Sequence, residues 1–531
     1  MNWIKRNWKS MVILWCLVPV LLAGYYGIQK QGYFVDEVWS YGLANSKEYA
    51  HIYSPEGWDQ HWIEPQYFKS YIEVDPGEGF SYESVFKNQE NDNHPPLFYL
   101  ILHTVSSFFP GQFSKWYGIL PNLVYLLITN IFLYRLLRKL SFSRSASVIG
   151  MLFYGLSAGA ISCAIYIRMY MMMTMWMVIL LNLYYEVMYN NEFRILDYVG
   201  CMLITFAGYM TQYYFYIAVF FGVVMLSLIL LYKRKMKQFS GFVVSNIGSL
   251  VLVLLCFPIS FKKILGKDTS RGIQAYQNLS KHTDVLEKIR KFYWVLNDEL
   301  FFSKLKYIII LLLAGMIAVI GYQCLKKKQT LCFREQIYIL IPICIFAGYF
   351  LVMALIAPYQ VDRYIFVLYP IAAVIVLYVI QKLLHTILVP EKTIAFFLLL
   401  FTLFFSFGEI EKIQYIYPEE KKNLQIVEQH QQEDCIYVSD EGYLITADII
   451  ELINYSAVRK INSADLQFVR EFLRPGKDEV MMYIDKELGE KKSIQSELGR
   501  NEQVGKYEYL FETDKCYVYH VRIVPEGVDR S

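Results

Sequence analysis

Two adjacent carboxylates, Asp36 and Glu37, stand in the stretch VDEVWS, shortly after an apolar run at positions 11–28. Ionised side chains are costly to keep at the edge of a bilayer, so such a pair needs water, lipid headgroups or a functional partner. Neighbouring residues do not point the same way on a regular helix or strand. We therefore expect a turn just beyond the first span, with one carboxylate facing a cavity and the other holding a positioning partner. An acid pair solvated at the interface is the alternative.

A histidine followed by two prolines, in NDNHPPLFY at 91–99, is a second candidate. A residue before proline is pushed toward an extended conformation, so His94 cannot easily continue a helix. Pro95 and Pro96 suit the first turn of a following helix. The sequence therefore predicts that His94 lies at a helix N-terminus, a place suited to oxyanions. The alternative is a helix-start signal with an incidental histidine.

Two arginines interrupt apolar stretches farther along the chain. Arg168 lies in AIYIRMYMMM, and Arg363 lies in APYQVDRYIFVLYP beside Asp362. An arginine in such surroundings either extends to the headgroups or binds an anion in a cavity. The polar and aromatic run YMTQYYFY, 209–216, is either an aromatic belt at the interface or part of the same polar face.

The composition indicates what must position these residues. Of the 531 residues, 55% are hydrophobic, 17% aromatic and only 19% charged, which is typical of a polytopic membrane protein. The net charge of +3 gives no nucleic-acid signal. Because a spanning helix needs about 20 apolar residues, we predict about eleven spans. They cover residues 11–28, 117–134, 145–163, 169–188, 198–213, 214–232, 241–260, 306–323, 335–355, 364–382 and 392–409.

Basic clusters orient these spans. Lysines and arginines gather after the second, sixth and eighth spans, at 135–139, 233–237 and 326–328. All three clusters face the cytoplasm if the N-terminus does, as the positive-inside rule requires. We therefore expect a multi-pass cell-membrane protein with a cytoplasmic N-terminus and large outer loops at 30–116 and 261–305. The apolar stretch 95–109 is too short to cross comfortably and is expected to lie at the outer interface.

The C-terminal region, 411–531, is richer in charge and alternates short β-branched runs, such as DCIYVSD, with helix-like stretches. This pattern predicts a small α/β domain, which the number of spans puts outside the cytoplasm. The expected fold class is thus an α-helical polytopic membrane protein, with a transmembrane domain at 1–410 and a C-terminal extracytoplasmic α/β domain. The sequence contains neither GxxxxGK nor GxGxxG, so nucleotide hydrolysis and dinucleotide binding have no support.

The predicted topology brings the polar residues to one side of the membrane. Acids that can act as a base there meet arginines that can hold a phosphate, beside a long acidic loop. Such a face suits a lipid-phosphate substrate that enters from the outer leaflet. The alternative is a polytopic lipid or sugar transporter, or a flippase. It needs polar residues near mid-membrane and related halves, whereas these charges concentrate at the outer edge.

At this point the sequence resembles a known group. The acid pair after the first span, HPPL at 94–97, the arginine of RMY at 168–170 and the late RY at 363–364 with its following YP look like the GT-C membrane glycosyltransferases. Within that group the chain is most similar to the bacterial, family-39-like relatives of the protein O-mannosyltransferases and of the lipid A aminoarabinose transferase. Gln212 stands where relatives often carry a histidine, which weakens a metal or histidine role there.

The resemblance implies an enzyme that moves a hexose or pentose from a polyprenyl-phosphate-linked donor to an extracytoplasmic protein, lipid or cell-envelope glycan. Asp36 then acts as the general base and Glu37 as its support, and a single displacement inverts the anomeric centre. No cofactor is required, although a divalent metal held by Asp36, Glu37 and His94 is compatible with the pattern. The residues assigned to the donor phosphate are Arg168, Arg363 and His94, and those assigned to the rest of the substrate are Tyr170, Gln212, Tyr213 and Tyr364.

Overall fold

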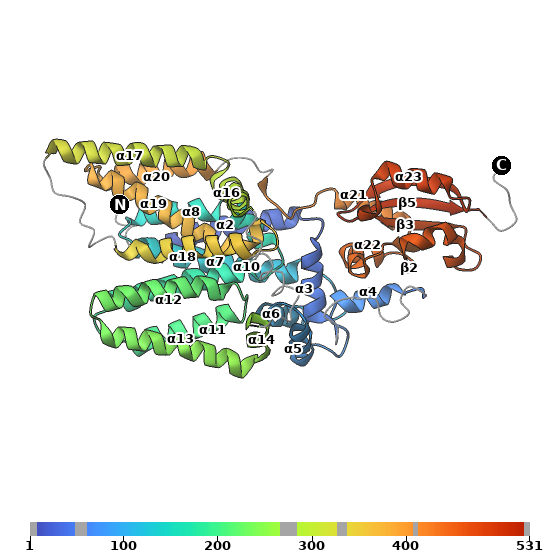
Figure 1. Ribbon diagram of the computed structural model, residues 1–531, viewed down its shortest axis with the longest axis horizontal. Coiled ribbons are helices and arrows are strands. Elements are labelled where there is room, and N and C mark those ends of the chain that lie inside the picture. The colour runs from blue at the N-terminus through green and yellow to red at the C-terminus, as the bar shows by residue number, and fades with distance from the viewer. Residues whose placement is uncertain (1–7, 48–60, 266–283, 327–336, 407–411, 525–531) are drawn as a thin grey trace. The chain divides into compact units, whose positions relative to one another are not determined.

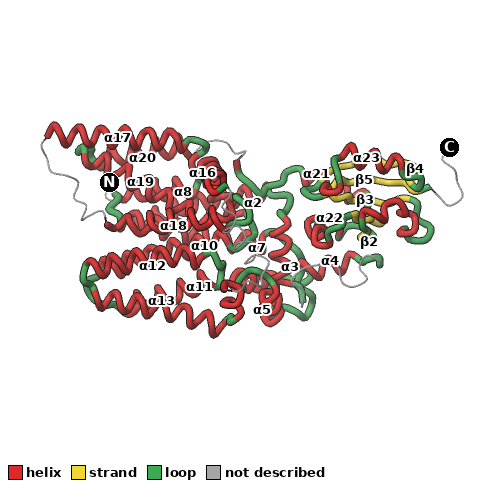
Figure 2. The backbone as a smooth tube through the Cα atoms, in the orientation of Figure 1, coloured by secondary structure: helices red, strands yellow, loops and turns green. Residues whose placement is uncertain are grey.

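The chain folds into two compact units of different construction (Figure 1). The structure is a computed structural model that describes residues 8–47, 61–265, 284–326, 337–406 and 412–524. Unit 1 comprises Met1–Gly27, Asn93–Phe98 and Gly118–Gln414, and unit 2 comprises Ile28–Asp92, Tyr99–Tyr117 and Tyr415–Ser531. The described part of unit 1 is built from helices, whereas unit 2 combines helices with a sheet (Figure 2).

Long apolar helices make up unit 1. Among the described residues, seven helices are long and apolar enough to cross a membrane, or up to nine elements if each of two bent pairs is one span. The bent pairs are α8 (Arg144–Gly155) with α9 (Ala158–Ile165), and α16 (Val285–Phe301) with α17 (Leu305–Lys326). The seven are α2 (Trp8–Gln29), α7 (Trp116–Lys139), α10 (Tyr170–Tyr189), α12 (Phe215–Tyr232), α13 (Met236–Cys256), α18 (Leu340–Ile356) and α19 (Tyr369–Thr386).

The predicted helical membrane architecture is confirmed. Each predicted span coincides with one of these elements, or with α11 (Ile195–Tyr209) or α20 (Glu391–Ser406), which have 15 and 16 residues. Because both are shorter than a typical spanning helix, the number eleven stays a prediction. The stretch at 95–109 forms α6 (Leu97–Ser106), whose 10 residues are too few to cross, as expected.

Helix α10 is the most deeply buried of the seven, with 83% of its span covered. It is apolar on all sides, and a helix of that kind belongs in the interior. Its run of methionines suits this position, because flexible thioether side chains fill irregular gaps between helices. The residues just before α10, which include Arg168, are thereby carried into the interior of unit 1.

The C-terminal part of unit 2 contains a five-stranded mixed sheet, in the order β2-β1-β3-β5-β4. Strand β1 pairs in parallel with both β2 and β3, and β5 pairs antiparallel with both β3 and β4. The predicted α/β domain is therefore confirmed. The strands are β1 (Asp434–Val438), β2 (Ala457–Ile461), β3 (Glu479–Asp485), β4 (Val504–Glu512) and β5 (Cys516–Ile523), and the helices are α21 (Glu420–Gln429), α22 (Ile449–Leu452) and α23 (Lys491–Arg500).

Most of the first predicted outer loop packs with this sheet region. The loop contains α3 (Val35–Asn45), α4 (Pro65–Ile72) and α5 (Tyr82–Asn91). Trp39 Nε1 donates to Thr446 Oγ1 at 2.8 Å, and Ile63 forms a bridge with Val458 on the edge strand β2. Residues 28–92 and 415–531 thus belong to one unit, while a domain boundary near residue 410 stays a prediction.

Candidate functional site

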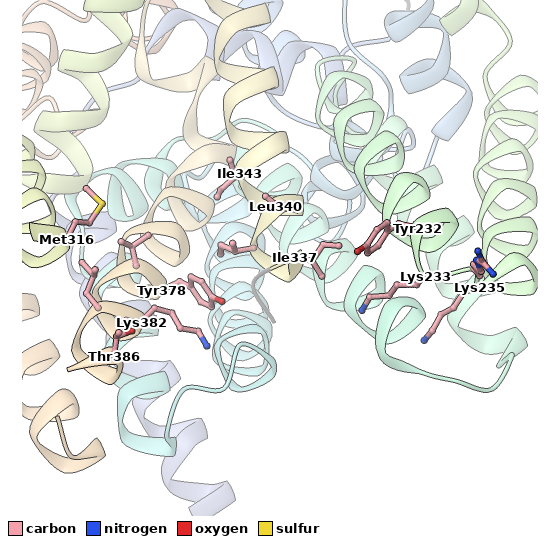
Figure 3. Close-up of a pocket in the computed structure, with 14 residues that line it drawn as sticks. Tyr232, Lys233, Lys235, Met316, Ile337, Leu340, Ile343, Tyr378, Lys382 and Thr386 are labelled. Carbon is pink, nitrogen blue, oxygen red and sulfur yellow. The ribbon is translucent and has the colours of Figure 1, made fainter. Parts of the chain in front are cut away.

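Three helices of unit 1, α10, α12 and α19, run in the same direction. At their C-terminal ends, Lys235 Nζ donates to the carbonyl oxygen of Met188 at 2.9 Å. Lys233, Lys235 and Lys382 line one cavity there, between the turn after α12 and the end of α19 (Figure 3). We call this the lysine end of unit 1.

The N-terminal ends of the same helices also meet. The ring of Tyr170, the first residue of α10, lies 6.2 Å from that of Phe366, just before α19. The ring of Tyr214, just before α12, lies 5.7 Å from that of Tyr364. This region is called the arginine end, because Arg168 and Arg363 both belong to it.

His94 and Arg168 form the centre of the arginine end. The two side chains are 3.3 Å apart, from Nη2 of Arg168 to Nε2 of His94. A guanidinium only donates hydrogen bonds, so Nε2 must accept, and the neutral ring then carries its proton on Nδ1. Arg168 is 3% exposed. That burial excludes the alternative in which its guanidinium extends outward to the headgroups.

The chain holds both residues in short breaks between helices. Arg168 lies between α9 and α10, and its backbone nitrogen donates to the carbonyl of Tyr166 at 2.8 Å. His94 precedes Pro95 and Pro96, directly before α6, as predicted from the histidine-proline-proline pattern. Leu97 at the start of α6 donates to the carbonyl of Met210 at 2.9 Å, so the histidine segment is tied to the turn before α12.

That turn contains Gln212 and Tyr213. Gln212 is 2% exposed, and its Nε2 has no hydrogen-bond partner among the described residues. The Tyr213 hydroxyl donates to Ser260 Oγ at 3.5 Å, which is a weak contact. A buried amide donor that lacks a protein partner costs stability, so its retention is typical of a place that receives a ligand or water.

Arg363 and Tyr364 lie in a 3-10 turn (Asp362–Tyr364) before α19. The guanidinium carbon of Arg363 is 5.6 Å from the centre of the Tyr364 ring, and the carbonyl of Tyr364 accepts from Tyr349 at 3.1 Å. The structure therefore brings six of the predicted residues to the arginine end with His94. They are Arg168, Tyr170, Gln212, Tyr213, Arg363 and Tyr364.

Glu299 and Gly159 also belong to the arginine end, and neither was predicted from the sequence. Glu299, near the end of α16, accepts a hydrogen bond from the Tyr369 hydroxyl at 2.9 Å and interacts electrostatically with Asp362. Gly159 makes room for this contact, since a Cβ there would lie 2.1 Å from the Tyr369 ring. The available signal was the pair of acids, Asp298 and Glu299, that follows the aromatic residues in KFYWVLNDEL.

The acid pair lies in unit 2, and the expected turn is wrong. Asp36 and Glu37 occupy the first turn of α3, where Glu37 Oε2 accepts from the backbone nitrogen of Phe34 at 2.8 Å and so satisfies a donor at the helix N-terminus. Glu37 is fully buried and forms an ion pair of 2.9 Å with Lys30. Asp36 is only half-buried.

Lys30 was also missed, because it reads as an ordinary basic residue at the end of a span. Its Nζ donates to Glu37 and to the carbonyl of Tyr415, at 2.9 and 2.7 Å. Complete burial lowers the pKa of Lys30, and the Glu37 carboxylate opposes that shift. Glu37 thus holds the start of α3 in place, and its charge is balanced by Lys30.

A second group of buried acids in unit 2 has no such cation. Asp448 and Glu451 line a small cavity together with Glu420, and none of the three forms an ion pair in the described ranges. Burial raises the pKa of Asp448 to about 6. Burial also raises the pKa values of Glu451 and Glu420, and the charge of each neighbouring acid adds to the effect on Glu451.

A cavity of about 1350 Å³ lies at the lysine end (Figure 3). It is lined by apolar side chains such as Leu340 and Ile343 and by the lysines that define that end. Lys233 donates to the Tyr338 hydroxyl at 3.1 Å, and burial followed by repulsion from Lys233 lowers the pKa of Lys235. None of the predicted site residues lines this cavity.

Comparisons with known proteins show which solved structures this architecture resembles. No protein-family model matches the chain, and no curated protein matches it. A similar solved structure is ArnT from Cupriavidus metallidurans in the apo state, with a TM-score of 0.50 and 11% identity over 97% of this chain and 98% of that one. ArnT bound to undecaprenyl phosphate gives a TM-score of 0.48 at 11% identity, with the same coverage.

A further similar structure is the archaeal oligosaccharyltransferase AglB from Archaeoglobus fulgidus, in complex with an inhibitory peptide and a dolichol-phosphate. Its TM-score is 0.45 at 12% identity, over 99% of this chain and 75% of that one. ArnT and AglB are glycosyltransferases of the GT-C fold. The likeness to apo ArnT over nearly the full length of both chains shows that this chain has that fold, which confirms the expected resemblance at the level of architecture.

Proposed function

We propose that the protein is an integral-membrane glycosyltransferase that moves a sugar from a polyprenyl-phosphate-linked donor to an extracytoplasmic acceptor. The observation that carries the proposal is the buried Arg168–His94 pair at the arginine end. A desolvated guanidinium is the group best suited to bind a phosphate, since its planar fork can form two charge-assisted hydrogen bonds. The similar structures support the donor class, because ArnT was solved with bound undecaprenyl phosphate and AglB with a dolichol-phosphate.

The leaving group of such a donor is a phosphate, so the reaction needs cations there more than it needs an acid. Arg168 and Arg363 supply these cations, and His94 accepts from Arg168 and fixes the direction of its guanidinium. Donors aimed at charge that develops in the transition state are typically worth about 10²–10³-fold each in rate. Tyr170 and Tyr364 are assigned to the sugar and prenyl parts of the donor, and Gln212 and Tyr213 to polar atoms of the substrate.

Asp36 is our proposal for the general base. Its carboxylate accepts the proton of the acceptor hydroxyl while that oxygen attacks the anomeric carbon, opposite the phosphate, and one displacement inverts the centre. The half-buried state of Asp36 suits a group that must meet a substrate. Glu37 acts through position, by holding the first turn of α3.

The sequence left a divalent metal at Asp36, Glu37 and His94 compatible with the pattern but not required. Glu37 Oε2 already accepts from both Lys30 and the nitrogen of Phe34. The buried ammonium of Lys30 already supplies the positive charge. We therefore derive no step of the reaction through a metal at Asp36, Glu37 and His94.

The test uses the purified full chain in liposomes with a panel of tagged polyprenyl-phosphate sugars. We expect one donor to be used by the wild type, and Asp36→Asn to lower the transfer rate by about 10²–10⁴-fold. Glu78→Gln is the matched control, because Glu78 belongs to the same loop and forms an exposed ion pair with Lys47. Retained transfer by a folded Asp36→Asn variant contradicts the base assignment.

The transporter or flippase reading makes the opposite forecast. It requires movement of the lipid-linked sugar across the membrane without formation of a new glycosidic bond. A wild-type protein that moves a tagged lipid between leaflets and transfers no sugar from any donor of the panel overturns the glycosyltransferase proposal.

A further inference from the structure

Three metal-ligating side chains meet in unit 2, away from the residues assigned to glycosyl transfer. His430 follows the end of α21, Glu433 lies three residues later, and His520 is in the middle of β5. One ligand atom from each of the three lies within 4.8 Å of the others. All three side chains are partly buried.

We propose that His430, Glu433 and His520 bind a divalent transition metal, with Zn²⁺ as the preferred ion. Two imidazole nitrogens and one carboxylate oxygen form a donor set that suits Zn²⁺, whereas Mg²⁺ and Ca²⁺ prefer oxygen ligands alone. Three protein ligands leave one position for water or a fourth residue. Nothing in the proposed glycosyl transfer uses this site.

The distances suit such an ion. His430 Nδ1 is 2.7 Å from Glu433 Oε1, and His520 Nε2 is 3.2 Å from Glu433 Oε2. In a tetrahedral zinc site, bonds of about 2.0–2.2 Å put neighbouring ligand atoms roughly 3.3–3.6 Å apart. Both distances in the structure are somewhat shorter than this, and all three ligand atoms lie within 4.8 Å of one another, so the side chains must rotate to receive the ion.

The carboxylate and the second histidine do not satisfy each other in the structure described. Glu433 Oε2 and His520 Nε2 are both buried, and neither makes a hydrogen bond within the described residues. A buried polar atom without a partner carries a cost, and a shared metal ion removes it for both atoms at once. An ordinary surface ion pair does not explain two buried atoms with poor mutual geometry.

The backbone holds the three ligands before any ion arrives. The nitrogen of Glu433 donates to the carbonyl of His430 at 3.0 Å, and the carbonyl of Glu433 accepts from Ser456 at 2.8 Å. His520 pairs in register with Met481 on β3 and with Glu508 on β4. A site on paired strands and a closed turn is more rigid than one on a free loop, which favours metal binding.

Glu508 is the candidate for the fourth ligand. It is exposed, and directly opposed residues on paired antiparallel strands extend from the same face of the sheet. The bound ion then connects the turn after α21 with β5, and so links the first helix of the C-terminal region to the centre of the sheet. The role we assign to the ion is structural.

The test measures metal bound by the purified full chain. Zn²⁺ alone is the probe, in equilibrium dialysis followed by elemental analysis, and Co²⁺ reports the coordination geometry through its visible absorption. We expect the wild type to bind one equivalent of Zn²⁺ at this site. His520→Asn should bind that equivalent at least about 10–100-fold more weakly, so that it holds one equivalent fewer when Zn²⁺ is limiting. His61→Asn is the matched control, since His61 is an exposed histidine of the same unit.

Glu433→Gln provides a second variant in case His520→Asn does not fold, because it preserves size and removes only the charge. A weaker but measurable effect is expected from Glu508→Gln. Equal binding by wild type, His520→Asn and Glu433→Gln overturns the proposal. So does Co²⁺ absorption that stays unchanged in the folded variants, because the ion then lies elsewhere.

Discussion

The two ends of unit 1 carry similar positive charge in different environments. At the arginine end, Arg168 is buried and hydrogen-bonded to His94. At the lysine end, Lys233 and Lys235 are half-buried and Arg234 is exposed. A buried cation costs several kcal/mol unless partners compensate, whereas an exposed one costs little. If the lysine end faces the cytoplasm, as the sequence predicts, the positive-inside rule explains its charges without any ligand, and it does not explain the arginine end.

The same contrast occurs within unit 2. Lys30 and Glu37 form a fully buried pair at 2.9 Å, and Lys47 and Glu78 form a pair of the same length at the surface. The distance is identical, so the environment alone separates them. Burial, and not the presence of charge, therefore distinguishes the residues that we propose for the site and its support from the basic and acidic residues at the surface.

The largest effect is expected from breaking the buried pair. Lys30→Met leaves the Glu37 carboxylate buried without its cation, which costs about 3–5 kcal/mol of unfolding free energy. Lys47→Met, its surface counterpart, costs at most about 1 kcal/mol. Denaturant unfolding of the full chain, followed by tryptophan fluorescence, measures both. Equal losses in the two variants contradict the contrast.

A slightly smaller effect is expected from removing a cation at the arginine end of unit 1. Removal of a cation at the lysine end is the comparison. Arg168→Gln should lower the transfer rate by about 10²–10³-fold, because a preorganised donor to the leaving phosphate is lost. Lys233→Gln should leave the rate unchanged. Initial rates in liposomes at matched protein levels compare the two. A comparable loss in Lys233→Gln shows that the lysine end takes part in the reaction.

The pH dependence of stability extends the comparison to buried acids that form no ion pair within the described residues. The folded pKa of Asp448, about 6, is above its ordinary value of 3.8, so the folded state binds the proton more tightly than the unfolded state. Its contribution is fully present below pH 3.8 and is lost as the pH rises through 6. At 1.36 kcal/mol per pH unit, the loss is about 3 kcal/mol.

We therefore expect the stability of unit 2 to fall between pH 4 and 7, and Asp448→Asn to flatten that dependence. The amide still accepts from the Tyr437 hydroxyl, which donates to Asp448 at 2.9 Å. Denaturation midpoints at several pH values measure the slope. An unchanged slope in the variant removes Asp448 as a source of it.

The smallest change is expected at Gln212. Gln212→Leu removes a buried donor that has no partner among the described residues, so stability should stay within about 1 kcal/mol of the wild type. If the amide binds substrate, the Michaelis constant for the donor or acceptor rises while the protein remains equally stable. A loss of stability without a kinetic change shows that the amide serves packing.

Much of the fold could be predicted, because long apolar runs and the placement of basic residues follow from the membrane itself. The bends could not be predicted. Ser157 caps α9 by accepting from the nitrogen of Ala160, and this break turns one apolar run into two helices at 59°. Hydropathy averages over such a break, since both halves are equally apolar.

The candidate site was predicted only as far as single residues stand out from their surroundings. Arg168 and His94 are visible in this way, although 74 positions separate them and only the fold brings them to 3.3 Å. Lys30 and Glu299 were missed because each resembles a common local pattern, the end of a span and a polar helix end. Lys30 donates to the carbonyl of Tyr415, and Glu299 accepts from the hydroxyl of Tyr369. Both partners are distant in the sequence.

The shared direction of α10, α12 and α19 has an electrostatic consequence. Each helix has a macrodipole equivalent to about half a positive charge at its N-terminus and half a negative charge at its C-terminus. Each of the three dipoles favours anions near its own N-terminus at the arginine end, whereas α13 and α18 begin at the lysine end and run the opposite way. The effect is therefore local to each helix end and falls off within one turn.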